Sequence, residues 1–230
     1  MMEYQKTEGI ILHLIPFGDS HQIVILFTLH AGLMKVMCYG SRSSKSKWHG
    51  LCRALTQVEI IYREKNSEIY ECRDLTLIHS FDNLKQEYQQ LEAACDLLYC
   101  LNRSQLVGKT APKLYALLIY YLSKISQIHE PWILSLSFRL KLLRHDGLLD
   151  YPFICQVCEE SLLLNAFYAQ NEAFCAKHAC ENSLFFAEED LHLIYALTAC
   201  PHYSGLTKLH LSAEIKSKVF ALFEDCLSGG

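Results

Sequence analysis

Residues His21–Tyr39 read HQIVILFTLHAGLMKVMCY, which are two β-rich runs separated by a short turn. Apolar residues dominate both runs, and β-branched and aromatic side chains, which suit the pleated surface of a sheet, make up most of the first. Gly32, which follows Ala31, tolerates the backbone angles of a tight reversal. The stretch therefore predicts two strands joined by a turn, at His21–Leu29 and Leu33–Tyr39.

The same alternation of strands and turns extends over the first 80 residues. We expect further strands at Gly9–Ile15, Gln57–Arg63 and Glu68–Ile78, with Gly18 opening the first turn. Short strands that recur about every eight to twelve residues are typical of a small barrel or sandwich. Five strands in about 75 residues favour an OB-type β-barrel.

After Ser80 the apolar residues recur at helical spacing. Each helix is predicted from a stripe of side chains on one face, which is the pattern of a helix that packs against a core. The first three stripes are Leu84, Tyr88, Leu91, Cys95 and Leu98; Leu114, Leu117, Leu118, Tyr121, Leu122 and Ile125; and Ile133, Leu136, Leu140 and Leu143. Two more helices are expected after Glu188 and after Ser212. The sequence thus predicts an α+β protein, with an OB-fold barrel in 1–80, a helical domain in 81–150 and 185–230, and an insertion in 151–184.

Charge is distributed unevenly along the chain. The whole sequence carries a formal net charge of -4, but no acidic residue lies between Asp19 and Glu59. A surface of positive potential is the minimum that a phosphate backbone requires. The candidate phosphate contacts in this interval are Lys35, Arg42, Lys45, Lys47 and Arg53.

The loop Ser41–Gly50, SRSSKSKWHG, contains most of these cations. Serine and lysine are also common in solvated linkers, so the loop has a purely structural interpretation as well. Tyr39 and Trp48 are candidates for stacking on nucleic-acid bases, and Trp48 is equally consistent with simple packing.

Two cysteine knuckles follow the third predicted helix. Cys155-Gln-Val-Cys158 is succeeded after sixteen residues by Cys175-Ala-Lys-His178-Ala-Cys180. This spacing is typical of a tetrahedral zinc site that draws two ligands from each of two turns, and a closed shell of four ligands makes such a site structural. The predicted ligands are Cys155, Cys158, Cys175 and, as the fourth, His178 or Cys180, of which His178 is favoured.

The alternative interpretation of the knuckles is a group of ordinary cysteines, or a site that has lost its metal. A zinc deaminase would need an upstream His-x-Glu motif, and the sequence has none. A zinc hydrolase with Cys175 and His178 at an open site is the last-ranked possibility. The sequence also lacks a Walker loop, a His-Glu-x-x-His pair, a Gly-x-Ser-x-Gly elbow and a dinucleotide fingerprint, so we expect no enzymatic activity.

Location is inferred from what the sequence does not contain. No apolar run approaches the roughly 18 residues of a membrane span. The start of the chain shows no export signal, and eleven cysteines without such a signal are typical of a reducing compartment. We expect a cytoplasmic protein that does not bind membranes.

Several segments together resemble the RecO family of bacterial DNA repair proteins. They are EGIIL at Glu8–Leu12, PFGDS at Pro16–Ser20, GLMKVMCYGSRSSKS at Gly32–Ser46, and RLKLLRHDG at Arg139–Gly147 just before the knuckles. The resemblance spans nearly the whole chain. Family members usually have a more basic loop at 41–47, and a cysteine is commoner at the position of His178.

The resemblance implies an OB-fold domain, a helical domain with a zinc element, and a nucleoid-associated role in DNA recombination and the repair of DNA damage. RecO-like proteins bind single- and double-stranded DNA, anneal complementary strands, act with RecR, bind the acidic C-terminal tail of SSB and help to load RecA. Charge alone makes Arg139, Lys141 and Arg144 candidates for docking the SSB tail, and a solvated helix face explains them equally well. The alternative function is a zinc-stabilised adaptor for protein partners with little affinity of its own for DNA.

Overall fold

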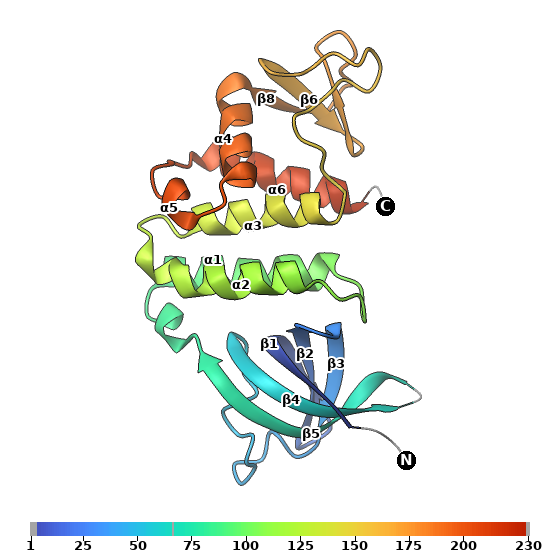
Figure 1. The fold of residues 1–230 in the computed structure, drawn as a ribbon, viewed down its shortest axis with the longest axis vertical. Helices are drawn as coiled ribbons and strands as arrows, with labels where there is room; N and C mark the ends of the chain where they lie inside the picture. The colour runs from blue at the N-terminus through green and yellow to red at the C-terminus, as the bar shows by residue number, and fades with distance from the viewer. Residues whose placement is uncertain (1–3, 66, 229–230) are drawn as a thin grey trace. The chain divides into compact units, whose positions relative to one another are not determined.

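The computed structural model describes residues 4–65 and 67–228. Contacts within the chain divide it into two compact units, residues 1–126 and 127–230. Figure 1 shows the strands of the barrel in the first unit and a small second sheet in the other. This division differs from the predicted one, because the first two long helices group with the barrel.

The first unit contains the five predicted strands, which close into a barrel. Their bounds are β1 Tyr4–Phe17, β2 His21–Thr28, β3 Gly32–Cys38, β4 Thr56–Lys65 and β5 Ser67–Ser80. The order around the barrel is β1-β2-β3-β5-β4, in which only the β3–β5 pair is parallel. β1 is longer than predicted because its first half pairs with β4 and its second half with β2.

Alternate residues of each strand fill the barrel interior. Val24 and Leu26 of β2 and Val36 and Cys38 of β3 are fully buried in one core cluster. Lys35 lies between the inward residues Met34 and Val36 of β3 and is partly exposed. Tyr39 directly follows Cys38 and is exposed. Since side chains alternate along a strand, the residues next to the inward ones point to the outer face.

Two helices complete the first unit. They are α1 Tyr88–Ser104 and α2 Pro112–Lys124, preceded and followed by the short 3-10 turns η1 Asp82–Lys85 and η2 Ile125–Gln127. α2 is fixed to the barrel by Tyr115, whose hydroxyl accepts a hydrogen bond from Gln57 at 3.2 Å and whose ring lies 6.3 Å from that of Phe27. The predicted stripe for α1 is partly wrong: Leu98 is buried as predicted, but Tyr88 and Cys95 are exposed, and Ala94, Leu97 and Leu101 are buried in their place.

Gly32 is the glycine on which the junction of the barrel and the helical segment depends. Its φ is +65°, and a Cβ at this position would overlap the carbonyl group of Lys109. The neighbouring Leu33 accepts a hydrogen bond from the amide of Gly108 at 3.0 Å. There is therefore no room for a side chain between β3 and the segment before α2.

We expect Gly32→Ala to lower the free energy of unfolding by more than about 3 kcal/mol, through both the positive φ and the overlap. Gly40→Ala is the matched control, because Gly40 has φ +71° and nothing within 4 Å of an added Cβ. That control isolates the cost of the backbone angle, about 1 kcal/mol. Urea denaturation followed by circular dichroism compares the two, and equal losses would contradict the close approach.

The second unit combines four helices with a three-stranded sheet. The helices are α3 Trp132–His145, α4 Glu188–Ala199, α5 Tyr203–Leu206 and α6 Ala213–Ser228, and the strands are β6 Asn165–Ala169, β7 Glu172–Phe174 and β8 Leu184–Ala187. The sheet is antiparallel in the order β7-β6-β8. No helix among the described residues is long and apolar enough to cross a membrane.

The sheet lies within and just beyond the predicted insertion and was missed by the sequence interpretation. The sequence signal for this hairpin is the pair Gln170-Asn171 between two apolar runs. In the structure both residues adopt positive φ, 52° and 67°, as a two-residue hairpin turn requires. Tyr168 anchors the hairpin, since its hydroxyl lies 3.2 Å from Cys226 Sγ of α6. The insertion is therefore an ordered hairpin attached to the helical core.

The expectation that Arg139 lies outside the core is wrong. Its side chain is 1% exposed, and the guanidinium carbon lies 4.0 Å from the ring centroid of Phe220 and 4.6 Å from that of Phe223. A guanidinium is planar and weakly hydrated, so it can pack between aromatic rings as an apolar side chain would. Spacing alone did not reveal this position, because residues 133–140 of α3 are all buried and no polar stripe remains.

Candidate metal centre and nucleic-acid interface

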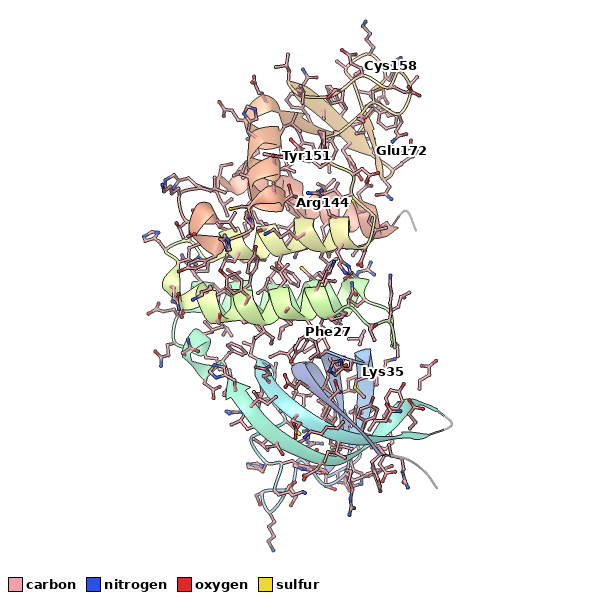
Figure 2. The ribbon with its side chains drawn as sticks, viewed as in Figure 1. Phe27, Lys35, Arg144, Tyr151, Cys158 and Glu172 are labelled. Carbon is pink, nitrogen blue, oxygen red and sulfur yellow. The ribbon has the colours of Figure 1, made fainter. Side chains whose placement is uncertain are left out.

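The first knuckle, residues 155–158, is part of a tight turn in the second unit. The amide of Cys155 donates to the carbonyl of Glu160 at 2.9 Å, and the amide of Glu159 donates back to the carbonyl of Cys155 at 2.8 Å. Glu159, which directly follows Cys158, has a φ of 59°, in the left-handed region. Figure 2 shows Cys158 in the loops beside the small sheet.

The second knuckle begins where β7 ends. The amide of His178 donates to the carbonyl of Cys175 at 3.0 Å, which forms a turn that brings the two side chains together. A hydrogen bond of 3.0 Å from the amide of Gln156 to the carbonyl of Ala173 joins the two knuckles. Backbone contacts thus hold both turns at one site.

The ligand atoms of Cys155, Cys158, Cys175 and His178 all lie within 4.8 Å of one another. The His178 Nδ1 atom is 3.5 Å from Cys155 Sγ and 3.3 Å from Cys175 Sγ, and the Sγ atoms of Cys158 and Cys175 are 3.8 Å apart. A tetrahedron with metal–sulfur distances of about 2.3 Å and a metal–nitrogen distance of about 2.0 Å has edges of about 3.8 Å and about 3.5 Å. These four residues could therefore hold a tetrahedral metal ion.

Cys180, the alternative fourth ligand, is exposed and does not belong to this group. The geometry brings His178 into the site, as we expected from the two-residue gap between Cys175 and His178. With four protein ligands, a metal ion here would have a filled tetrahedral shell.

The electrostatics of the knuckles suit a cation. Burial raises the pKa of the Cys155 thiol, but backbone amides of Cys175, Cys158 and Val157 outweigh it and lower that pKa to about 5. For Cys158 the amide of Glu160 lowers the pKa, while Cys155, burial and Cys175 together raise it. Neighbouring thiolates repel one another, and a divalent ion would relieve that repulsion.

The predicted DNA-binding residues of the barrel lie on the outside of β3 and in the loop after it. Lys35 and Tyr39 face outward, and Figure 2 labels Lys35 on the barrel. Arg42 and Lys45 are exposed, and the Arg42 guanidinium donates to the carbonyl of Gly18 at 3.1 Å. In the part of the chain that the structure describes, Lys45 has no carboxylate partner.

Two of the five candidate cations are paired with carboxylates that the sequence places far away. Lys47 Nζ lies 2.6 Å from Asp74 Oδ1, and the Arg53 guanidinium lies 3.2 Å from Asp82 Oδ2. Lys47 is the main cause of the lowered pKa of Asp74, and Lys85, Ser80 and Arg53 lower the pKa of Asp82 to about 2. The interval without acidic residues is therefore partly neutralised in the folded chain.

Trp48 occupies the interior and does not lie on the surface. It is 8% exposed, belongs to the barrel core cluster, and donates from Nε1 to Asp74 Oδ1 at 3.4 Å. A ring buried in this way is not available for stacking on a base, so the packing interpretation holds. The loop is anchored through Trp48 and Cys52 and is not a free linker.

A row of rings beside Tyr39 was missed by the sequence interpretation. Phe17 pairs with His21 across β1 and β2, and the ring of His21 lies 5.3 Å from that of Tyr39 in an edge-to-face contact. Residues directly opposite on neighbouring strands point to the same face. Phe17 is 52% and Tyr39 47% exposed, so this end of the outer face presents two accessible aromatic rings beside Arg42. The signal was Phe17 immediately before the Gly18 turn.

A cleft of about 480 Å³ adjoins the loop. Its lining includes Gln22, Arg42, His49 and Arg53. The two arginines of the candidate set thus line one depression of the surface, although Arg53 shares its charge with Asp82.

Comparison with known proteins agrees with the resemblance noted in the sequence. Residues 1–81 match the family model described as recombination protein O N terminal, and residues 93–229 match that described as recombination protein O C terminal. A protein of Chlamydia trachomatis serovar L2 named DNA repair protein RecO is 27% identical over 222 residues, which cover 96% of this chain and 91% of the relative. Proteins of the same name from Chlamydia pneumoniae and Bacillus cytotoxicus are 24% identical over 217 residues, covering 94% and 86% of the two chains, and 23% identical over 177 residues, covering 76% and 71%.

Proposed function

Because the chain belongs to the RecO family of DNA repair and recombination proteins, we propose that it binds DNA through the outer face of its barrel and carries out no catalysis. On this proposal it binds single- and double-stranded DNA, anneals complementary strands, and mediates loading of RecA together with RecR and SSB. The work would take place at the bacterial nucleoid in the cytoplasm.

One observation carries the proposal. Exposed cations and exposed aromatic rings meet on the outside of β1, β2 and β3 and in the loop that follows. We infer that the barrel is an OB fold, in which the face of strands 2 and 3 and the loop between strands 1 and 2 bind oligonucleotides. Phe17, Tyr39 and Arg42 lie at that face or beside that loop.

The chemistry follows from the two kinds of side chain. Lys35, Arg42 and Lys45 would neutralise phosphates, which releases counterions and makes the binding weaken with salt. Phe17 and Tyr39 would stack on bases without reading their identity. A strand held in this way keeps its hydrogen-bonding edges accessible, so a second strand can pair with it and no covalent step is needed.

The knuckles would supply structure. We propose zinc as the bound ion, because three thiolates and one imidazole suit a borderline-soft d10 cation in a closed shell. The ion would fix the two turns beside the hairpin of β6 and β7.

Fewer of the three candidate residues remain available for docking the acidic SSB tail in the folded chain. Arg139 is buried, and Lys141 Nζ donates to the carbonyl of Cys200 at 2.6 Å. Arg144 is exposed at the end of α3 and is the remaining candidate. Figure 2 labels it on that helix.

A protein adaptor with little affinity for DNA is the second candidate. The pairing of Lys47 with Asp74 and of Arg53 with Asp82 favours it, because both pairs reduce the cationic surface. An acidic SSB tail peptide would then bind while a bare oligonucleotide would not.

The experiment is a fluorescence-anisotropy titration of the full chain with labelled single-stranded and duplex oligonucleotides at several salt concentrations, with and without an SSB tail peptide. We expect binding of the single strand without the peptide, and a linear decrease of the logarithm of affinity with the logarithm of salt concentration. Peptide binding without oligonucleotide binding at low salt would support the adaptor in place of the DNA-binding function.

A further inference from the structure

Three cysteines lie at one end of the barrel interior, in the first unit and apart from the knuckles. Cys38 ends β3, and Cys72 of β5 is one residue beyond Glu71, which pairs with Met37 in the parallel register. Cys52 comes from the loop after β3 and belongs to the same buried core cluster. All three are free thiols.

The three thiols differ in their access to solvent. Cys38 is fully buried, whereas Cys52 is 9% exposed and lines the surface cleft that also contains Arg42, His49 and Arg53. A small reagent that enters this cleft can reach Cys52, whereas Cys38 is fully buried and does not line the cleft. Arg42 and Arg53 line the cleft, and because Arg53 shares its charge with Asp82, Arg42 is the cation that favours an anion there.

Cys52 and Cys38 also differ in pKa. The interaction with Cys38 lowers the pKa of Cys52, burial opposes this, and Gln22 lowers it further. The pKa of Cys38 is strongly raised, first by Cys52, then by Cys72 and by burial. Cys52, which lines the cleft, is therefore also the thiol of the pair with the lower pKa, and the thiolate is the reactive form.

We propose that Cys52 and Cys38 form a peroxide-sensitive dithiol, in which Cys52 is the residue attacked by the oxidant and Cys38 resolves it to a disulfide. In the first step the Cys52 thiolate attacks one oxygen of hydrogen peroxide. The O–O bond breaks, and Cys52 becomes a sulfenic acid while hydroxide leaves. In the second step Cys38 sulfur attacks Cys52 sulfur, an S–S bond forms, the S–O bond breaks, and the departing oxygen leaves as water with the Cys38 proton. Two thiols are oxidised by two electrons, and one peroxide is reduced.

The disulfide would join the basic loop to β3. Residues 39–51 lie between the two cysteines, and they include Arg42, Lys45 and Lys47. Closing this segment into a covalent loop restricts its conformations. The chemistry of the dithiol does not depend on whether those cations bind DNA, so its test is independent of the proposed function.

Peptide mapping of the full chain with its metal retained tests the proposal. The protein is exposed to hydrogen peroxide at pH 7, free thiols are alkylated, and trypsin separates the three cysteines into residues 36–42, 48–53 and 66–73. We expect the peptide 36–42 joined to 48–53 to exceed any other pairing of the three by at least about tenfold. A Cys38–Cys72 disulfide as the main product, or Cys52 recovered as a free alkylated thiol, would overturn the proposal.

Two variants and one internal reference sharpen the result. Cys52→Ser should leave Cys38 and Cys72 reduced, and Cys72→Ala should still form the Cys38–Cys52 disulfide. Before oxidation, iodoacetamide should alkylate Cys52 at least about tenfold faster than Cys72. Cys95, an exposed thiol on α1, serves as the reference that should be alkylated and remain outside any disulfide. If a variant does not fold, the mapping of the wild-type chain decides alone.

Discussion

Cys175→Ser protein is expected to retain less than about one-tenth of the zinc that the wild-type chain binds. Wild-type protein purified without added metal should contain about one zinc per chain by elemental analysis. Cys175 lies within 3.8 Å of Cys158 Sγ and within 3.3 Å of His178 Nδ1, so its loss removes one corner of the tetrahedron and leaves the others without their neighbour. A hydroxyl is a much poorer zinc ligand than a thiolate.

Loss of the ion should also destabilise the second unit. The knuckles flank the hairpin of β6 and β7, and binding energy in a structural site contributes directly to folding. We expect the free energy of unfolding to decrease by at least about 2 kcal/mol in urea denaturation followed by circular dichroism. Chelation of the wild-type protein should give a similar decrease.

Cys180→Ser is the matched control for this prediction. It makes the same chemical change five residues away, at an exposed cysteine outside the four-residue group. The variant should keep about one zinc per chain. Loss of zinc from Cys180→Ser, or a wild-type chain with almost none, would contradict the proposed ligand set.

The second large effect is expected from the loop of the barrel. Replacing Arg42, Lys45 and Lys47 together with alanine should weaken binding of single-stranded DNA by about tenfold or more at low salt. The slope of log affinity against log salt should become shallower by about 1.4 if two of the cations contact phosphates and by about 2 if all three do. The pairing of Lys47 with Asp74 favours the smaller change.

Net charge must be controlled, because the triple variant loses three positive charges. Alanine at Lys109, Lys113 and Lys208, three exposed lysines elsewhere, makes the same change in net charge. Those substitutions should leave the affinity within about twofold of wild type. Equal weakening in both triple variants would mean that the loop has no specific role.

Asp74→Asn should change the affinity in the opposite direction. Asp74 Oδ1 accepts hydrogen bonds from Lys47, Trp48 Nε1 and the amide of Leu75, and an asparagine oxygen can keep the last two. Removing the negative charge frees Lys47 for a phosphate, so binding should strengthen and its salt dependence should steepen. Unchanged binding would show that Lys47 does not contact DNA.

The barrel could be predicted from the sequence because it is encoded locally. Alternation of apolar and polar residues and glycines at turns such as Gly18 determine strands over short stretches, and the knuckle spacing likewise limits where ligands can lie. The expectations that failed concern residues whose surroundings depend on contacts with residues far away in the sequence. The partners of Lys47 and Arg53 come from β5 and η1, the burial of Arg139 depends on two phenylalanines of α6, and the burial of Trp48 depends on the barrel interior.

The single parallel pair has a consequence for synthesis of the protein. β3 and β5 meet at Lys35–Ile69, and β4 is made between them. Until β5 has left the ribosome, β3 has a partner only on its β2 side, and β4 can pair only with β1. A nascent chain interrupted before β5 would therefore present an open hydrogen-bonding edge, a template for aggregation that the complete polypeptide removes.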